Sequence, residues 1–368
     1  MKKVAILSFQ HAYNYGAVFQ VAALQHIISE LGYDCDIIDY RSEGIEKQYR
    51  FRHLYLNKSL INNLRANLVL LPFLTKKKIN FQKWMHDYKA TKPMNRGELR
   101  SIADKYDKFV VGSDQVWNFK CNGDDSSFML DFVPKEKRIA YAASIGYYEI
   151  PNKYKHWFET FIHQFKHISV REKRAGELVE PYMGGEHCCV CVDPVFLVGR
   201  KFWEMKMAKQ CDVQEPYIFV YQLGHSNYIP KYLKQLKKQE QYKIVYVTGH
   251  IGNIVKYSFQ DKNLSSTSPE NFLYMLVNAK YVVTNSFHAT VLSLIFKKNF
   301  WVVNSGGNGA ATNNRLYSLL DNFGLSNRIV SSFEKAHLTN MTDFSNFDNL
   351  YKKMCLSSME YLKTSLDD

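Results

Sequence analysis

Hydrophobic and polar residues alternate along the first half of the chain in a pattern that predicts short buried strands joined by amphipathic helices. The apolar run Lys3–Phe9 predicts a first strand, Ala17–Leu31 a helix, and Cys35–Asp39 a second strand. Later strands are predicted at Phe109–Val111, Arg138–Ser144, Ile168–Val170 and Cys188–Val192, and later helices at Lys153–Phe165 and Glu172–Glu180. Because strands and helices alternate, we expect a parallel sheet.

The same alternation restarts at Pro216 and indicates a second unit of similar design. Its strands are predicted at Tyr217–Tyr221, Ile244–Thr248, Tyr281–Thr284 and Trp301–Val303, and its helices near Tyr228–Gln241, Pro269–Ala279 and Phe287–Phe296. We therefore predict an α/β protein of two Rossmann-like, doubly wound domains. Ligands bind beyond the carboxyl ends of strands in such sheets, so a central cleft between the domains is expected to hold the functional site.

Length supports this division into domains. The chain has 368 residues, which at roughly 100 to 200 residues per domain favours two domains. We expect an N-terminal domain over residues 1–205, with an insertion at about 49–92, and a C-terminal domain over 206–343. A last helical stretch at 344–362 is expected to pack back across the first domain.

Composition indicates a globular protein without a membrane span. Hydrophobic residues make up 46% and charged residues 23% of the chain. The uncharged stretch Tyr281–Phe296 contains Asn285, Ser286 and His288 and falls short of the roughly 20 apolar residues of a spanning helix. The N-terminal apolar run lacks a small-residue cleavage site. We expect a cytoplasmic protein.

The cysteines fit a reducing compartment, because they number seven and show no disulfide framework. His187-Cys188-Cys189-Val190-Cys191 could form half of a soft-metal site. The spacing matches no common zinc pattern, and alternation with Val190 and Val192 favours a buried strand. We therefore predict no metal site.

The net charge is +13, which favours an anionic partner. Nucleic acid, an anionic membrane and a phosphorylated substrate all satisfy this charge. No recognised nucleic-acid signature is present and the positive charge is dispersed, so we do not expect a nucleic-acid partner.

The segment Tyr49–Lys92 fits neither domain pattern well. Basic residues surround its apolar stretch Leu64–Leu74, namely Arg50, Arg52, Lys58, Arg65, Lys76, Lys77, Lys78 and Lys83. One interpretation is an interfacial contact with an anionic membrane. The other is a helical insertion that covers the first sheet, with its lysines on the solvated face. Pro72 interrupts the pattern, and we favour the insertion.

Two strand-to-helix turns of the first domain could bind an anion, because such turns present backbone N–H groups and the positive end of a helix dipole. Asn14-Tyr15-Gly16-Ala17 follows the first strand. Its single glycine does not make a dinucleotide fingerprint, which argues against NAD or FAD. Gly112-Ser113-Asp114-Gln115 follows a later strand. Asp114 either caps a helix there or accepts a proton from a hydroxyl group.

His288 lies in a third turn of this kind, Thr284-Asn285-Ser286-Phe287-His288-Ala289-Thr290, at the start of a helix. A lone histidine is more often structural, but this position favours a role as acid or base. Arg171 also follows a strand. Its planar fork could grip a carboxylate or phosphate, or it could form a surface ion pair with Glu172 or Glu177.

Taken in order, these segments resemble the polysaccharide pyruvyl transferase family. The matching segments are Asn14-Tyr15-Gly16-Ala17-Val18-Phe19-Gln20, Val111-Gly112-Ser113-Asp114-Gln115-Val116-Trp117-Asn118, Ser169-Val170-Arg171-Glu172, Val192-Asp193-Pro194-Val195-Phe196 and Ser286-Phe287-His288-Ala289-Thr290. The resemblance runs from residue 3 to about 330. It implies a GT-B-like arrangement and the transfer of pyruvate from phosphoenolpyruvate onto two sugar hydroxyls as a cyclic ketal.

The resemblance also implies roles for particular residues. Arg171 corresponds to an arginine that binds phosphoenolpyruvate, and His288 to a catalytic histidine. Relatives often carry arginine two residues before this histidine, where this chain has Ser286, so we expect Arg315 to supply the missing charge. Asp114 is expected to orient or deprotonate an acceptor hydroxyl. Further substrate-binding candidates are Asn14, Tyr15, Gly16, Ser113, Gln115, Asn285 and Thr290.

The implied reaction needs phosphoenolpyruvate as a co-substrate and no metal or organic cofactor. Its acceptor would be a sugar of a surface polysaccharide precursor. If that precursor is lipid-linked, the basic segment becomes a docking surface on the inner membrane leaflet. A nucleotide-sugar glycosyltransferase is an alternative, because the architecture is shared. A non-catalytic protein that binds anions or lipids is a further alternative.

Overall fold

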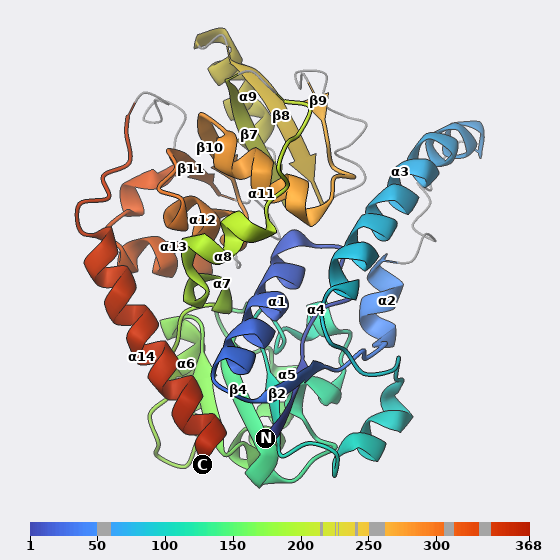
Figure 1. The fold of residues 1–368 in the computed structure, drawn as a ribbon, viewed down its shortest axis with the longest axis vertical. Helices are drawn as coiled ribbons and strands as arrows, with labels where there is room; N and C mark the ends of the chain where they lie inside the picture. The colour runs from blue at the N-terminus through green and yellow to red at the C-terminus, as the bar shows by residue number, and fades with distance from the viewer. Residues whose placement is uncertain are drawn as a thin grey trace.

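The computed structural model describes residues 1–49, 60–213, 216–224, 226, 228–239, 242–249, 262–304, 313–330 and 340–368. They form two stacked α/β halves, each built on a parallel six-stranded sheet (Figure 1). This confirms the prediction of two Rossmann-like, doubly wound units.

The first sheet has the strand order β2-β1-β3-β4-β5-β6. Its strands are β1 Lys3–Leu7, β2 Asp34–Ile37, β3 Lys108–Val111, β4 Arg138–Ala143, β5 His167–Val170 and β6 Cys189–Val190. Its helices are α1 Tyr15–Glu30, α2 Glu43–Tyr49, α3 Leu60–His86, α4 Phe119–Asn122, α5 Asn152–Phe161 and α6 Lys173–Val179. Helices cover both faces, so β3 and β4 are wholly buried, and each is apolar after a first basic residue, Lys108 or Arg138. By contrast, β6 is exposed, so the expected buried strand at Cys188–Val192 is wrong.

The second sheet has the order β12-β11-β10-β7-β8-β9. Its strands are β7 Tyr217–Gln222, β8 Lys243–Thr248, β9 Lys262–Asn263, β10 Tyr281–Thr284, β11 Phe300–Val303 and β12 Ile329–Val330. The helices from this part of the chain are α7 Pro194–Leu197, α8 Gly199–Lys206, α9 Tyr228–Gln239, α11 Pro269–Asn278, α12 Phe287–Ile295, α13 Asn313–Asn322 and α14 Phe347–Asp367. The 3-10 helices of the described residues are η1 Arg96–Ile102, η2 Ser126–Met129, η3 Lys135–Lys137, η4 Ile162–Gln164, η5 Glu180–Tyr182 and η7 Ser326–Arg328.

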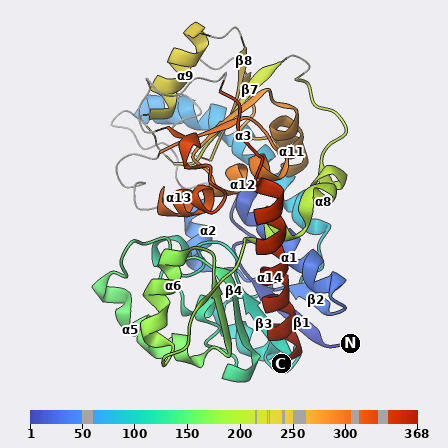
Figure 2. The same ribbon diagram turned by 90° about the vertical axis from the view of Figure 1, so that its left-hand side faces the viewer.

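Aromatic side chains pack the two halves against each other. Tyr15 of α1 stacks on Phe272 of α11 with ring centroids 4.2 Å apart, and Phe19 packs edge-on against Trp203 of α8. Helix α14 runs along both halves (Figure 2) and buries Leu362 among apolar residues of the first sheet and its helices. The first turn of α1 and the α11 region are therefore held in a fixed relation. The domain boundaries proposed from the sequence stay a prediction.

The insertion forms the long helix α3, which continues through Pro72 and whose N-terminal end extends away from the body (Figure 1). Lys76 is exposed and Lys78 half-buried, but Lys77 is buried. The expectation that these lysines share the solvated face is therefore wrong for Lys77. Arg50, Arg52 and Lys58 lie outside the described residues. No helix in the described part of the chain is both long enough and apolar enough to cross a membrane.

Candidate functional site

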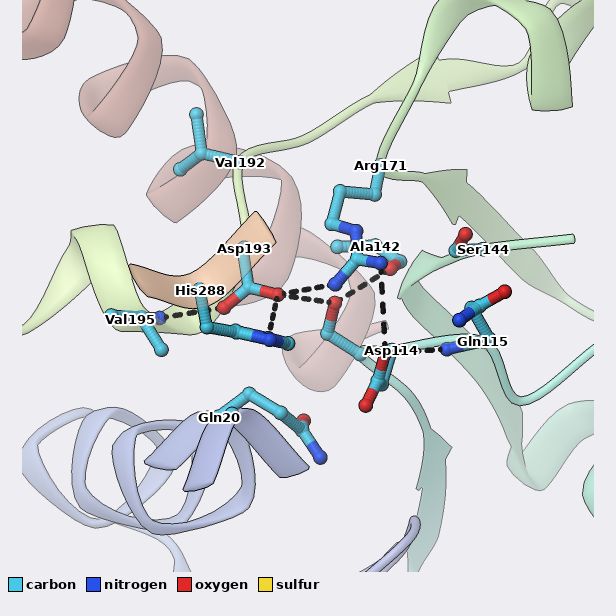
Figure 3. A network of polar contacts seen from close by, with 12 residues as sticks. Gln20, Asp114, Gln115, Ala142, Ser144, Arg171, Val192, Asp193, Val195 and His288 are labelled. Atoms are coloured by element: carbon cyan, nitrogen blue, oxygen red, sulfur yellow. Dashed lines mark hydrogen bonds and ion pairs between the residues drawn. The ribbon is translucent and has the colours of Figure 1, made fainter. Parts of the chain in front are cut away.

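Four segments converge where the first sheet meets the N-terminus of α12 (Figure 3). Asp114 follows β3, Arg171 follows β5, and Asp193 caps the N-terminus of α7. His288 lies in the first turn of α12, which follows β10 of the second sheet. The carboxyl ends of strands from both halves thus bring together the imidazole and the guanidinium that the sequence singled out.

Asp193 is the centre of this cluster. Its Oδ2 accepts hydrogen bonds from Arg171 Nη1 at 2.7 Å and Ser113 Oγ at 3.0 Å, and lies 3.2 Å from His288 Nε2. Its Oδ1 accepts from the Val195 backbone N–H at 3.0 Å. Because a carboxylate oxygen only accepts, the Nε2 of His288 carries the proton in this contact. Asp193 therefore fixes both the tautomer and the orientation of the imidazole.

Charges within the cluster hold Asp193 and Arg171 in their ionised forms. Burial alone would raise the pKa of Asp193, but His288 and Arg171 outweigh it and hold the pKa well below its ordinary value. Burial likewise works against the charge of Arg171, but Asp193, Asp114 and Glu172 outweigh it and raise the pKa of Arg171. The guanidinium also lies over the Phe287 ring, 4.1 Å from its centroid.

Two arginines of the site retain N–H groups without a hydrogen-bond acceptor among the described residues. These groups are Nε and Nη2 of Arg171 and Nε of Arg315. Nη2 of Arg171 lies 3.6 Å from Asp114 Oδ1, close enough for charge attraction but too far for a hydrogen bond. Burial first, and the charge of Arg171 second, lower the pKa of Arg315. Buried donors of this kind normally have a partner, so each of the two guanidinium groups retains the capacity to bind an oxyanion.

Gly16 packs directly against the imidazole. A Cβ atom at this position would lie 2.0 Å from Nδ1 of His288, so only glycine fits. Asn14 caps α1 by accepting a hydrogen bond from the Gly16 N–H at 2.9 Å, and the first turn of α1 has no acidic residue. The N-terminus of α1 thus lies beside His288, and no acidic side chain of its own first turn offsets the positive end of the helix dipole.

The turn after β3 gives Asp114 a fixed position. Its φ is +69°, and its Oδ1 accepts the N–H of Gln115 at 2.9 Å. It does not cap a helix, because Asn118 is the N-cap of α4. The amide Oε1 of Gln115 accepts from Asn118 Nδ2 at 2.8 Å. Asp114 is therefore held beside Arg171, while Gln115 is engaged within its own turn.

Other candidates from the sequence have side chains engaged in the fold. Tyr15 donates its hydroxyl to the Thr267 carbonyl at 3.0 Å, and Asn285 bonds both backbone groups of Leu223. Ser286 caps α12, and Thr290 donates to the Ser286 carbonyl at 2.9 Å. Their role in substrate binding stays a prediction.

The sequence predicted no role for one carboxylate of the cluster and a surface role for another. Asp193 is part of a matching motif, and its place before Pro194 signals only a helix cap. Glu172 was an alternative partner for Arg171 in a surface ion pair, and it does lie 3.7 Å from Arg171, but both side chains are buried. Glu172 also accepts a hydrogen bond from Ser144 Oγ at 2.6 Å and leaves its Oε2 without a donor among the described residues.

The described residues contain no group of three or more His, Cys, Asp or Glu side chains placed to hold a metal ion. All seven cysteines are free, with Cys189 exposed and Cys191 buried.

Comparison with solved structures shows the fold alone. The S. aureus MnaA-UDP co-structure is similar with a TM-score of 0.50 at 11% identity, covering 100% of this chain and 98% of that chain. The structure of UDP-GlcNAc 2-epimerase from Neisseria meningitidis bound to UDP-GlcNAc has a TM-score of 0.46 at 10% identity, and the match covers 100% of this chain and 99% of that chain. The structure of the wall teichoic acid polymerase TagF has a TM-score of 0.48 at 12% identity, and the match covers 99% of this chain and 88% of that chain.

The fold shared with the S. aureus MnaA-UDP co-structure and the two parallel six-stranded sheets agree with the predicted GT-B-like arrangement of two Rossmann-like halves. A search of curated proteins found no match. The family model for polysaccharide pyruvyl transferases matches residues 14–307, a span that includes Asp114, Arg171, Asp193 and His288. The chain therefore belongs to the polysaccharide pyruvyl transferase family.

Proposed function

We propose that the protein transfers pyruvate from phosphoenolpyruvate to two hydroxyls of a sugar, forms a cyclic ketal and releases phosphate. The observation that carries this proposal is the buried guanidinium of Arg171, which shares Asp193 with His288 and keeps two N–H donors without an acceptor among the described residues. Phosphoenolpyruvate bears a phosphate and a carboxylate, so it needs at least two cationic partners. The family membership supports the same donor chemistry.

In this proposal the arginines hold the donor. One guanidinium binds the phosphate and the other the carboxylate, which neutralises the donor and assists departure of phosphate. Ser286 stands where relatives often have an arginine, and Arg315 compensates for that loss. The side chain of Arg171 is only 1% exposed, so the donor reaches it when the surrounding segments move apart.

His288 performs the proton transfers of the proposed reaction. Protonated imidazole gives its proton to the methylene carbon of phosphoenolpyruvate, and positive charge develops at the adjacent carbon. A sugar hydroxyl adds there, and the now neutral His288 takes its proton. Asp193, which is ionised and in contact with Nε2, holds the ring in a fixed orientation during these transfers. Each such transfer is worth roughly 10²–10⁴-fold in rate.

Asp114 serves the acceptor. When phosphate leaves, the second hydroxyl attacks the same carbon and closes the ring, and its proton needs an acceptor. The Asp114 carboxylate lies beside Arg171 and is partly exposed, with 13% of its side chain accessible. It is therefore suited to orient the hydroxyl pair and to receive this second proton.

The test is incubation of the protein with phosphoenolpyruvate and a panel of free and lipid-linked glycans. A mass gain that corresponds to pyruvate, together with an equal amount of released phosphate, is the expected result. Transfer of a sugar from a nucleotide sugar, with phosphoenolpyruvate inert, would replace this proposal with glycosyl transfer.

A lipid-linked acceptor would bring the protein to the inner face of the membrane as a peripheral protein. The exposed positions Lys76, Leu71 and Ile79 of α3 support this part of the proposal. Co-sedimentation with anionic liposomes, lost on charge reversal at Lys76 and Lys78, is expected. Equal sedimentation with neutral liposomes and in the charge-reversed variant would contradict it.

A further inference from the structure

The proposed reaction leaves one proton without a source. His288 gives a proton to the methylene carbon and takes one from the first hydroxyl, so it returns to its starting state. Asp114 receives the proton of the second hydroxyl. Phosphate is a poor leaving group as a trianion, so its bridging oxygen must gain a proton as its bond to carbon breaks. An acid is therefore needed beside the guanidinium that holds the phosphate.

Glu172 is a buried carboxylate that the proposed reaction does not use. It stands at the N-cap position of α6 but makes no side-chain hydrogen bond to that helix. Its Oε1 accepts a hydrogen bond from Ser144 Oγ at 2.6 Å, and its Oε2 has no donor among the described residues. Buried carboxylate oxygens normally have a hydrogen-bond partner. Glu172 thus keeps one oxygen open.

The open oxygen of Glu172 lies beside the open edge of Arg171. Oε2 is 3.7 Å from Arg171 Nε, and Oδ1 of Asp114 is 3.6 Å from Nη2 (Figure 3). Both distances are too long for a hydrogen bond, and Nε and Nη2 have no acceptor among the described residues. Nη1 is engaged, since it donates to Asp193 at 2.7 Å. The guanidinium therefore offers its Nε–Nη2 edge, with a carboxylate on each side.

An oxyanion bound to this edge would meet two like charges. Buried charges of one sign this close repel strongly, because the surroundings screen them poorly. A protonated carboxyl group would instead donate a hydrogen bond to the oxyanion. Oδ1 of Asp114 already accepts the N–H of Gln115 at 2.9 Å. A proton on Oε2 of Glu172 breaks no contact of the described residues, so Glu172 is the better site for it.

The charges around Glu172 couple this proton to the donor. They come from Arg171 on its own turn, Asp114 on the turn after β3, and Arg315 in the first turn of α13. Burial first, and Arg171 second, lower the pKa of Arg315, whereas the charge of Glu172 raises it. Both arginines thus attract the carboxylate when no donor is bound. An anionic donor that engages them offsets this attraction and adds repulsion, which favours the protonated form of Glu172.

We propose that Glu172 takes up a proton when the phosphate of the donor binds Arg171, and gives that proton to the phosphate as it leaves. The bond between the bridging oxygen and the former enol carbon breaks, and its electron pair stays on the oxygen. The proton of Glu172 joins that oxygen, and hydrogen phosphate is released. Two protons leave the sugar in all, one joins the methylene carbon and one joins the phosphate, so the count balances.

This inference rests on the proposed function for its chemistry, but the proton uptake can be measured without turnover. Titration calorimetry with phosphoenolpyruvate, in two buffers of different ionisation enthalpy, counts the protons bound with the donor. The parent should take up about one proton more than Glu172→Gln, whose amide stays neutral. Glu172→Gln mimics the protonated form and should bind the donor at least as tightly. Equal proton uptake in the parent and in Glu172→Gln would overturn the proposal.

The matched control is Glu177→Gln, which neutralises an exposed carboxylate of α6 that pairs with Arg174. This variant should take up as many protons as the parent. A loss of uptake in Glu177→Gln equal to that in Glu172→Gln would overturn the assignment to Glu172.

Infrared difference spectroscopy of the parent covers the outcome in which Glu172→Gln does not fold. Inorganic phosphate is the probe, because it has no carboxyl group of its own. Its binding should replace a carboxylate band with a carboxylic acid band that shifts in heavy water, and Asp114→Asn should retain that band. No carboxylic acid band in the parent, or its loss in Asp114→Asn, would overturn the proposal.

A change of leaving group distinguishes proton transfer from a structural role. Sulfate leaves without a proton because it is the anion of a strong acid, so sulfoenolpyruvate needs no acid at this step. Glu172→Gln should lower kcat by about 10²-fold or more with phosphoenolpyruvate and far less with sulfoenolpyruvate. An equal loss with both donors would overturn the role of Glu172 as the acid.

The same variants separate this inference from the proposed function. Proton uptake on phosphate binding that depends on Glu172, without any pyruvyl transfer, would retain the coupling and reject the function. Ketal formation at the parent rate in Glu172→Gln would retain the function and reject the acid.

Discussion

Arg171 and Lys77 are two cations buried to a similar degree, with 6% and 7% of each residue exposed, but their surroundings differ. Arg171 has Asp193 at 2.7 Å, Asp114 at 3.6 Å and Glu172 at 3.7 Å. Lys77 has aromatic rings and no ion-pair partner among the described residues. The pKa of Arg171 is raised, whereas burial lowers that of Lys77 to about 8.

The two surroundings give the two buried cations different properties. Carboxylates fix Arg171 in one geometry and one charge state, as a reaction centre requires. Lys77 keeps a charge whose burial costs folding free energy, which the two aromatic faces offset only in part.

The largest effect is expected from His288→Ala, which removes the acid and base from the compensated cluster. Ketal formation should fall by at least about 10³-fold, while circular dichroism shows that the variant is still folded. Activity within about tenfold of the parent, a barrier change of only about 1.4 kcal/mol, would show that another group transfers the protons.

Asp193→Ala should break the cluster itself. Removing one partner of a buried ion pair leaves Arg171 without its closest carboxylate, so urea denaturation should show a loss of about 3–5 kcal/mol. Because the folded pKa of Asp193 is depressed, its stabilisation is present above the ordinary carboxyl pKa and is lost as the pH falls below it. The difference between parent and variant should therefore shrink in acid. Asp348→Ala, which removes an exposed pair with Lys297, should cost at most about 1 kcal/mol.

Lys77→Met should stabilise the protein, in contrast to the loss of stability expected for Asp193→Ala. Lowering the pKa of Lys77 from 10.5 to about 8 costs the parent at most about 3 kcal/mol of folding stability at neutral pH. Between pH 8 and 10.5 the unfolded chain binds more protons than the folded protein. The parent therefore becomes more stable as the pH rises through this range. The difference in stability between Lys77→Met and the parent should shrink accordingly. Denaturation at several pH values measures this. A loss of stability at pH 7 would mean that the aromatic contacts outweigh the buried charge.

Gly16→Ala should displace the imidazole without removing it. The added Cβ would lie 2.0 Å from Nδ1 of His288, so the ring must shift, and a displacement of about 1 Å can cost about 10²-fold in rate. Gly97→Ala, where the nearest atom would be 3.3 Å away, is the control. Parent-like turnover in Gly16→Ala would show that the contact with α1 does not position His288.

Arg315→Met should give the smallest effect, a KM for phosphoenolpyruvate raised by about tenfold with little change in kcat. Arg315→Lys should recover part of the affinity because it restores the charge. The control is Arg200→Met, which removes an exposed pair with Glu204. An unchanged KM in Arg315→Met would mean that Arg171 holds the donor with another partner.

The predicted strands agree with the structure where both faces of a strand are covered, because such strands are continuous apolar runs. The strand Tyr281–Thr284 has the predicted bounds, and Tyr217–Tyr221 differs by one residue. The strand near Cys188 was predicted too long and too buried, because it lies exposed at the edge of the sheet. A hydrophobic pattern alone does not distinguish an edge strand from a central one.

A sequence pattern likewise identifies only some of the residues of the candidate site. Arg171, Asp114 and His288 could be found because each lies within a few residues of the carboxyl end of a strand, where parallel sheets place their ligands. Asp193 follows a two-residue strand that carries little pattern, and its central role depends on contacts from three distant segments. Lys77 lies in a run of three lysines that predicts a solvated face. Only the packing of α3 on α1 reveals that its side chain is buried.

The most direct measurement is titration of phosphoenolpyruvate into the parent protein, Arg171→Met and Lys77→Met, with a panel of nucleotide sugars in parallel. The account predicts that phosphoenolpyruvate binds the parent and Lys77→Met alike, and that Arg171→Met loses the binding. Binding that survives in Arg171→Met, or a parent protein that binds a nucleotide sugar and not phosphoenolpyruvate, would contradict it.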